Sequence, residues 1–81
     1  MAATHASIVR RVLRDLEALP ADASKASIED ACVPLRDLFT SFEGLPAAER
    51  RRRHRRVTGL LEYRRLNRLH ARLTNRAHGL L

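Results

Sequence analysis

The sequence predicts an all-α protein, and three observations lead to that class. The core must be built from aliphatic side chains, because the chain holds two Phe, one Tyr and no Trp. Apolar residues recur every three or four positions, which is the spacing of one helix face. Three Gly and three Pro are too few for a series of tight hairpins. We expect a single domain over residues 1–81, with helices at 6–19, 28–43 and 47–79 packed as a hairpin or bundle.

The first helix is predicted over residues 6–19. Its apolar residues lie largely on one face, and charged residues lie largely on the other. Either Thr4 or Ser7 can cap its N-terminus. Pro20 ends the helix, because proline lacks the backbone N–H and restricts the residue before it. The apolar face consists of Ile8, Val9, Val12, Leu13, Leu16 and Leu19.

The second helix, over residues 28–43, has the most regular apolar stripe. Pro34 lies inside it, and a proline in a helix interior costs about 3 kcal/mol. The helix therefore either bends there, or a short turn precedes a helix that starts at Pro34. Gly44 and Pro46 then suit a tight corner between two helices. The stripe consists of Ile28, Cys32, Leu35, Phe39 and Phe42.

The third helix, over residues 47–79, contains a conflict of phase. Its later leucines share one face, with arginines gathered on the other side, but Val57, Leu60 and Leu61 project on the arginine side. Either Gly59 ends one helix, or the helix is continuous and a different partner covers each face. We favour a continuous or slightly kinked helix, whose length of about 50 Å exceeds what such a small domain needs and indicates self-association. The arginines are Arg64, Arg65, Arg68, Arg72 and Arg76.

These stripes define a predicted core and a residual patch. Val57, Leu60 and Leu61 do not join the core, and we expect them to form a dimer or partner interface, because such patches are rarely left exposed on monomers. The predicted core is Ile8, Val12, Leu16, Leu19, Ile28, Cys32, Leu35, Phe39, Phe42, Leu66, Leu69, Leu73 and Leu80.

Charge gives the clearest indication of a partner. The net charge is +7, and residues 49–56 read ERRRRHRR. A helical turn of this composition cannot be buried, and arginines near the positive end of a helix are unfavourable. Arginine forms bidentate bonds with phosphate, which favours binding of an anion. The alternative is a solvated stretch that Glu49 partly neutralises.

Catalysis is not expected from this sequence. It has no glycine-rich phosphate loop and no HExxH motif, and its four His share no metal-ligand spacing. Cys32 belongs to the apolar stripe and is expected to be a small buried residue. We therefore expect no enzyme, cofactor or metal. With a single cysteine and no apolar run near the ~20 residues that cross a bilayer, a cytoplasmic location is expected.

Two short resemblances accompany this pattern. A basic stretch before Leu66, Leu73 and Leu80 is loosely similar to basic-zipper transcription factors, although the seam between these leucines is mostly polar. The stretch YRRLNRLHARL is similar to the C-terminal helix of flagellar filament-junction chaperones through Leu66, Asn67 and Leu69. The glycine expected soon after that asparagine is absent. We assign neither family.

The sequence thus predicts a small regulatory or adaptor protein that binds an acidic or helical protein surface, and itself forms a homodimer. The alternative is a nucleic-acid-binding protein that uses the arginine run on phosphates. The predicted partner-binding residues are Val57, Leu60, Leu61, Arg64, Arg65 and Arg68. The residues predicted for nucleic acid are Arg50, Arg51, Arg52, Arg53, Arg55 and Arg56.

Overall fold

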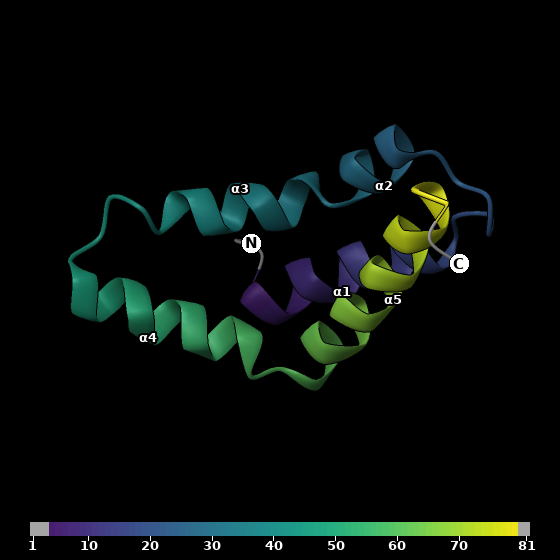
Figure 1. The fold of residues 1–81 in the computed structure, drawn as a ribbon. Helices are drawn as coiled ribbons and strands as arrows, with labels where there is room; N and C mark the ends of the chain where they lie inside the picture. Colours follow the sequence, from purple (N-terminus) through teal and green to yellow (C-terminus); the bar gives the residue numbers. More distant parts are fainter. Residues whose placement is uncertain (1–3, 80–81) are drawn as a thin grey trace.

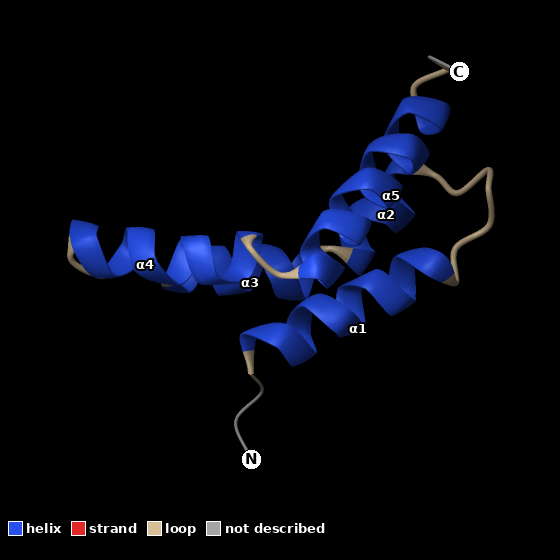
Figure 2. Ribbon diagram, turned by 90° about the horizontal axis from the view of Figure 1, so that it is seen from below, coloured by secondary structure: helices blue, strands red, loops and turns tan. Residues whose placement is uncertain are grey.

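The computed structural model describes residues 4–79, which form five α-helices and no strand (Figures 1 and 2). The predicted all-α class is confirmed for this part of the chain. Two of the three predicted helices are each divided in two, so the predicted number was wrong. The helices are α1 (His5–Glu17), α2 (Lys25–Ala31), α3 (Val33–Ser41), α4 (Ala47–Thr58) and α5 (Leu61–Ala77).

Helix α1 lies at the centre of the fold. The side chain of Thr4 caps it by accepting a hydrogen bond from the Ser7 N–H at 3.0 Å, as one of the two predicted caps. Its main neighbour is α5, and it also packs against α2, α3 and α4. Four of its residues are buried: Val9, Val12, Leu13 and Leu16.

The predicted second helix is interrupted at Cys32, which separates α2 from α3. Pro34 lies in the first turn of α3, where its missing N–H removes no intrahelical hydrogen bond. This is the second of the two alternatives that the sequence left open. Helix α2 begins earlier than predicted, because Ser24 caps it by accepting a hydrogen bond from the Ser27 N–H at 3.1 Å.

The favoured continuous C-terminal helix is wrong, because the chain breaks between α4 and α5. Gly59 caps α4, and Leu60 has an extended backbone with φ −70° and ψ 140°. A Cβ atom on residue 59 would lie 3.1 Å from the carbonyl oxygen of Arg55, which is a close approach. The break resolves the conflict of phase, since Val57 before it and Leu66 after it are both buried in one core.

The core confirms most of the predicted side chains. Val12, Leu16, Ile28, Leu35, Phe42, Leu66 and Leu73 are buried, and Ile8, Leu19, Cys32, Phe39 and Leu69 are half-buried. Leu80 lies outside the described residues. Buried residues that the core prediction omitted are Val9, Leu13, Ala23 and Val57.

The molecule is longer than a compact domain of its size. Its radius of gyration is 13.5 Å, against about 12 Å for a compact chain of this length, and its extents are 39 × 27 × 21 Å. Helices α3 and α4 run antiparallel, and the turn between them lies far from α2 and α5 (Figures 1 and 2). Within residues 4–79, no helix is both long and apolar enough to cross a membrane.

Candidate protein-binding groove and arginine-rich helix

The three apolar residues predicted to form an interface do not form one surface. Val57 is fully buried in the chain's own core, and Leu60 is half-buried against it. Leu61 alone is exposed, at 70% of its surface. The prediction of an apolar patch was therefore wrong. The helix break at Gly59 places Val57 in the core, so no continuous apolar surface surrounds Leu61.

An open groove of about 600 Å³ runs between α1 and α5. The α1 side contributes buried leucines, and α5 contributes Leu69 and Leu73 together with a row of arginines. The groove thus combines a basic wall with a floor of leucines, of which Leu19 and Leu69 are half-buried and the others belong to the buried core. Its lining includes Leu13, Leu16, Leu19, Arg65, Arg68, Arg72 and Arg76.

The four arginines of the groove follow one edge of α5. Arg65, Arg68, Arg72 and Arg76 are separated by three or four positions, which places them on one helix face over about 16 Å. The sequence indicated that these arginines lie opposite the leucine face. In the structure, the row instead borders that face. Two of the predicted partner-binding residues, Arg65 and Arg68, belong to it. Arg64 is also exposed but does not line the groove.

Little negative charge opposes this row. Glu17 is the one acidic residue that lines the groove, and it forms no ion pair there. Among residues 4–79, ion pairs are found at one carboxylate only, that of Glu49. The basic wall of the groove is therefore not neutralised by the described part of the chain.

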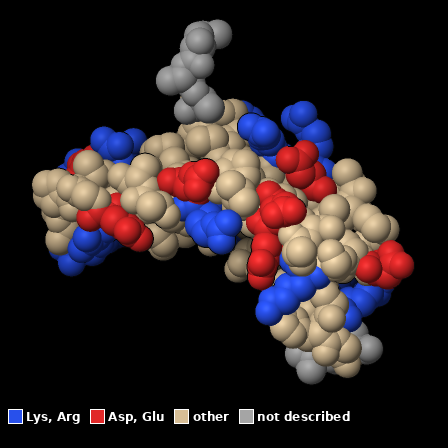
Figure 3. Space-filling view, turned by 90° about the horizontal axis from the view of Figure 1, so that it is seen from above, with Lys and Arg blue, Asp and Glu red and all other residues tan. Residues whose placement is uncertain are grey.

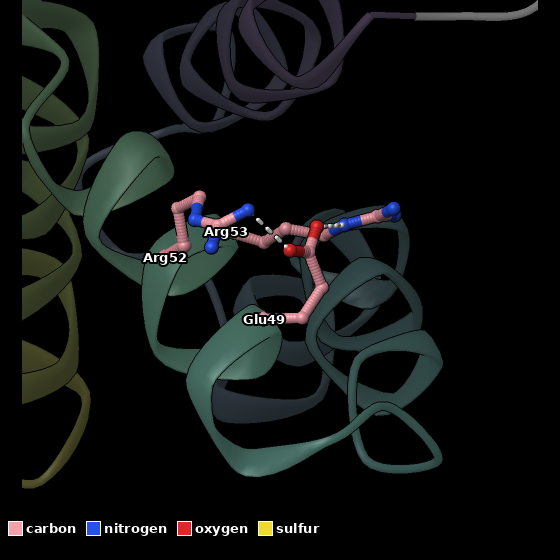
Figure 4. Close-up of polar contacts among 3 residues, drawn as sticks. All are labelled: Glu49, Arg52 and Arg53. Carbon is pink, nitrogen blue, oxygen red and sulfur yellow. Dashed lines mark hydrogen bonds and ion pairs between the residues drawn. The ribbon is translucent and has the colours of Figure 1, made fainter.

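Helix α4 displays the arginine run around most of its circumference. Val57 is its one buried residue. Glu49 accepts from Arg52 at 2.7 Å and from Arg53 at 2.9 Å, one guanidinium on each carboxylate oxygen (Figure 4). The hydrogen bond from Arg53, together with nearby positive charge, holds the pKa of Glu49 below its ordinary value. Arg50, Arg51, Arg55 and Arg56 are exposed and form no such pair with any residue between positions 4 and 79.

One residue of the run, His54, contacts α3 through its ring although it remains exposed. The ring of His54 lies against Phe39 of α3, with centroids 5.1 Å apart and planes inclined by 36°. Phe39 also contacts Tyr63 and Phe42, which extends the aromatic cluster to the core. This contact fixes which side of α4 faces the α3 helix, so the opposite side of α4 faces solvent.

Charge is divided unevenly along the chain. Residues 1–46 have seven acidic and five basic side chains, whereas residues 47–81 have two acidic and eleven basic ones. The net charge of the second segment is thus +9, and that of the first is −2. Viewed over α2 and α3, the surface shows acidic side chains spread among basic ones (Figure 3). The excess positive charge belongs to α4 and α5.

A second hollow, of about 400 Å³, lies between α3 and α5. Cys32, Phe39, Tyr63 and His70 are among its lining residues. Partial burial raises the pKa of the Cys32 thiol, and the charge of Arg36 opposes this only in part. A thiol with a raised pKa is a poor nucleophile near neutral pH. No group of three or more His, Cys, Asp or Glu within residues 4–79 is placed to hold a metal ion.

No family model, curated protein or solved structure matches this chain.

The groove between α1 and α5 was not predicted from the sequence, although the pattern of arginines in α5 contained part of the evidence for it. Arg72 and Arg76 share the helical phase of Arg65 and Arg68. The α1 wall gives no such signal, because nothing in the pattern shows which edge of α1 lies beside these arginines.

Proposed function

We propose that this protein is a non-enzymatic binding module, which takes an acidic amphipathic helix of a partner protein in the groove between α1 and α5. The observation that carries the proposal is the juxtaposition of a leucine floor with a row of unpaired arginines. An apolar helix face can pack on the half-buried Leu19 and Leu69, and carboxylates along its edge can reach the arginines. A phosphate backbone would use the arginines but has no apolar face for the floor.

The spacing supports a helical occupant. The arginine row of α5 covers about 16 Å, which corresponds to about three turns of a partner helix lying along the groove. Carboxylates repeated every three or four residues on that helix would meet Arg65, Arg68, Arg72 and Arg76 in turn. Because these pairs are exposed to solvent, each contributes about 0.2–1 kcal/mol, and they select the partner more than they tighten the complex.

The test uses a synthetic helical peptide of about 18 residues, with leucines on one face and glutamates along its edge. Binding is followed by fluorescence polarisation. Reversing two charges, Arg68→Glu with Arg72→Glu, should weaken binding at least about tenfold, because attraction becomes repulsion at two positions. The matched control, Arg10→Glu with Arg11→Glu, makes the same change of charge on an exposed part of α1 away from the groove.

A second peptide, with lysines in place of the glutamates, distinguishes specific charge pairing from non-specific binding. It should bind the wild type poorly and the Arg68→Glu, Arg72→Glu variant better. Equal binding of the glutamate peptide to the groove variant and to its control would contradict the proposal. So would a lysine peptide that binds the wild type as well as the glutamate peptide does.

Self-association and a cytoplasmic location stay predictions. The homodimer was predicted from the length of an unbroken C-terminal helix and from three apolar residues. That helix is divided at Gly59, and two of the three residues lie wholly or partly in the core. A single exposed leucine supplies far less than the ~800 Å² per partner of a standard interface. Any dimer would therefore have to use the groove or another surface. Sedimentation at several micromolar concentrations measures the oligomeric state directly.

A further inference from the structure

The outward face of α4 is not used by the groove, and we propose that it is a separate binding site for the phosphate backbone of double-stranded nucleic acid. The face is centred on Arg52 and Arg55, which point away from the buried Val57 and the stacked His54, and Arg51 and Arg56 lie at its two edges. The site would bind without regard to base sequence.

The density of charge on α4 matches that of a duplex. Six arginines lie between residues 50 and 56, a distance of about 9 Å along the helix axis. This is about one positive charge per 1.5 Å, whereas double-stranded DNA has one negative charge per ≈ 1.7 Å of its axis. Glu49 offsets only one of the six, so α4 as a whole has a net charge of +5.

The shape of this face also suits phosphate. A hollow of about 290 Å³ is lined by Arg51, Arg52 and Arg55 and by the small side chain of Ala48. A neighbouring hollow of about 370 Å³ is lined by Arg50, Arg51, His54 and Arg55, so it lies at the edge of this face nearer to α3. Both hollows are bordered by guanidinium groups, each of which can donate two parallel hydrogen bonds to a phosphate.

Other anionic partners fit this face less well. A membrane-binding helix buries a face of large apolar residues, but the exposed apolar residues of α4 are Ala47 and Ala48. Single-stranded nucleic acid is bound by stacking of bases on aromatic side chains, and the one ring system of α4, His54, already lies against Phe39. A regular duplex backbone requires neither feature.

The test measures fluorescence anisotropy of a labelled duplex DNA of arbitrary sequence over a range of salt concentrations. With about four phosphates contacted, affinity should fall about 10²-fold between 50 and 200 mM salt, since the slope is ≈ −0.9 per phosphate. The variant with Arg51→Gln, Arg55→Gln and Arg56→Gln should lose most of that slope. These side chains are exposed and form no ion pair, so thermal unfolding should be nearly unchanged.

The matched control is Arg10→Gln, Arg11→Gln and Arg14→Gln, which removes the same charge from an exposed side of α1. It should keep the slope and bind within a few-fold of the wild type. Equal loss in both triple variants would show that net charge alone governs binding and would overturn the proposal. The proposal would also be overturned if the protein did not bind DNA at 50 mM salt. The same holds if it bound vesicles of anionic lipid or a polyglutamate chain as tightly as duplex DNA.

The two proposals fail independently. The Arg68→Glu, Arg72→Glu variant changes the groove and leaves the outward face of α4 intact, so it should retain duplex binding. The triple glutamine variant of α4 should in turn retain the glutamate peptide.

Discussion

Val57 gives the sharpest test of the fold, because sequence pattern and structure place it differently. The structure buries it completely, whereas Leu61, four residues later, is 70% exposed. Val57→Ala removes two methyl groups from the core, which lowers the free energy of unfolding by about 1.6 kcal/mol at ≈ 0.8 kcal/mol per buried carbon. The cavity that remains raises this loss to about 2–3 kcal/mol. A chain of this length has a total stability of about 4–12 kcal/mol, so the loss is a large fraction.

The assay is urea unfolding followed by circular dichroism, with thermal unfolding beside it. Val57→Ala should lower the melting temperature by about 10–20 °C, because each kcal/mol corresponds to about 4–8 °C in a domain of this size. Leu61→Ala is the matched control and should change stability by less than about 1 kcal/mol, since most of that side chain is in water. If both variants lose the same stability, or if Val57→Ala loses none, Val57 does not pack in the core as described.

Three further predictions concern single side chains. Glu49→Gln should be less stable than the wild type at neutral pH, because it loses the ion pairs with two arginines. The difference in stability should shrink as pH falls through the lowered pKa of the native carboxylate, since protonation removes the same ion pairs from the wild type. A difference that grew in acid would contradict this reasoning. Cys32 should react with a thiol reagent more slowly in the native protein than in urea at the same pH, because burial raises its pKa, and equal rates would count against it. Ser24→Ala should lower the free energy of unfolding by about 1 kcal/mol through loss of the α2 cap, measured by urea unfolding.

The helices and most core residues could be predicted from periodicity, because one buried face per helix leaves a direct trace in the sequence. Thr4 caps the start of α1 by a local backbone hydrogen bond, whereas the helix ends at Glu17, three residues before Pro20. The break at Gly59 could not be predicted, since glycine inside a helix costs only ~1 kcal/mol and the conflict of phase has two solutions. Packing of Val57 against the core selects one of them.

The candidate groove was less predictable than the helices. The sequence indicates an arginine-rich face on α5, but the depth and floor of the groove depend on how α1 lies against it. That arrangement is a contact between segments far apart in the chain, and one sequence contains no trace of it. The arginine run of α4 was visible at once. Its outward face was not, because it is defined by the contact of His54 with Phe39.

The pairing of α1 with α5 has a consequence for synthesis on the ribosome. The central helix of the fold is made before its main partner, with α2, α3 and α4 translated in between. Until α5 emerges, the leucines of α1 lack their principal cover, and the nascent chain exposes an apolar surface of the kind that chaperones bind. Final packing must therefore be a late event, and a ribosome that stalls before α5 would hold a chain prone to aggregation.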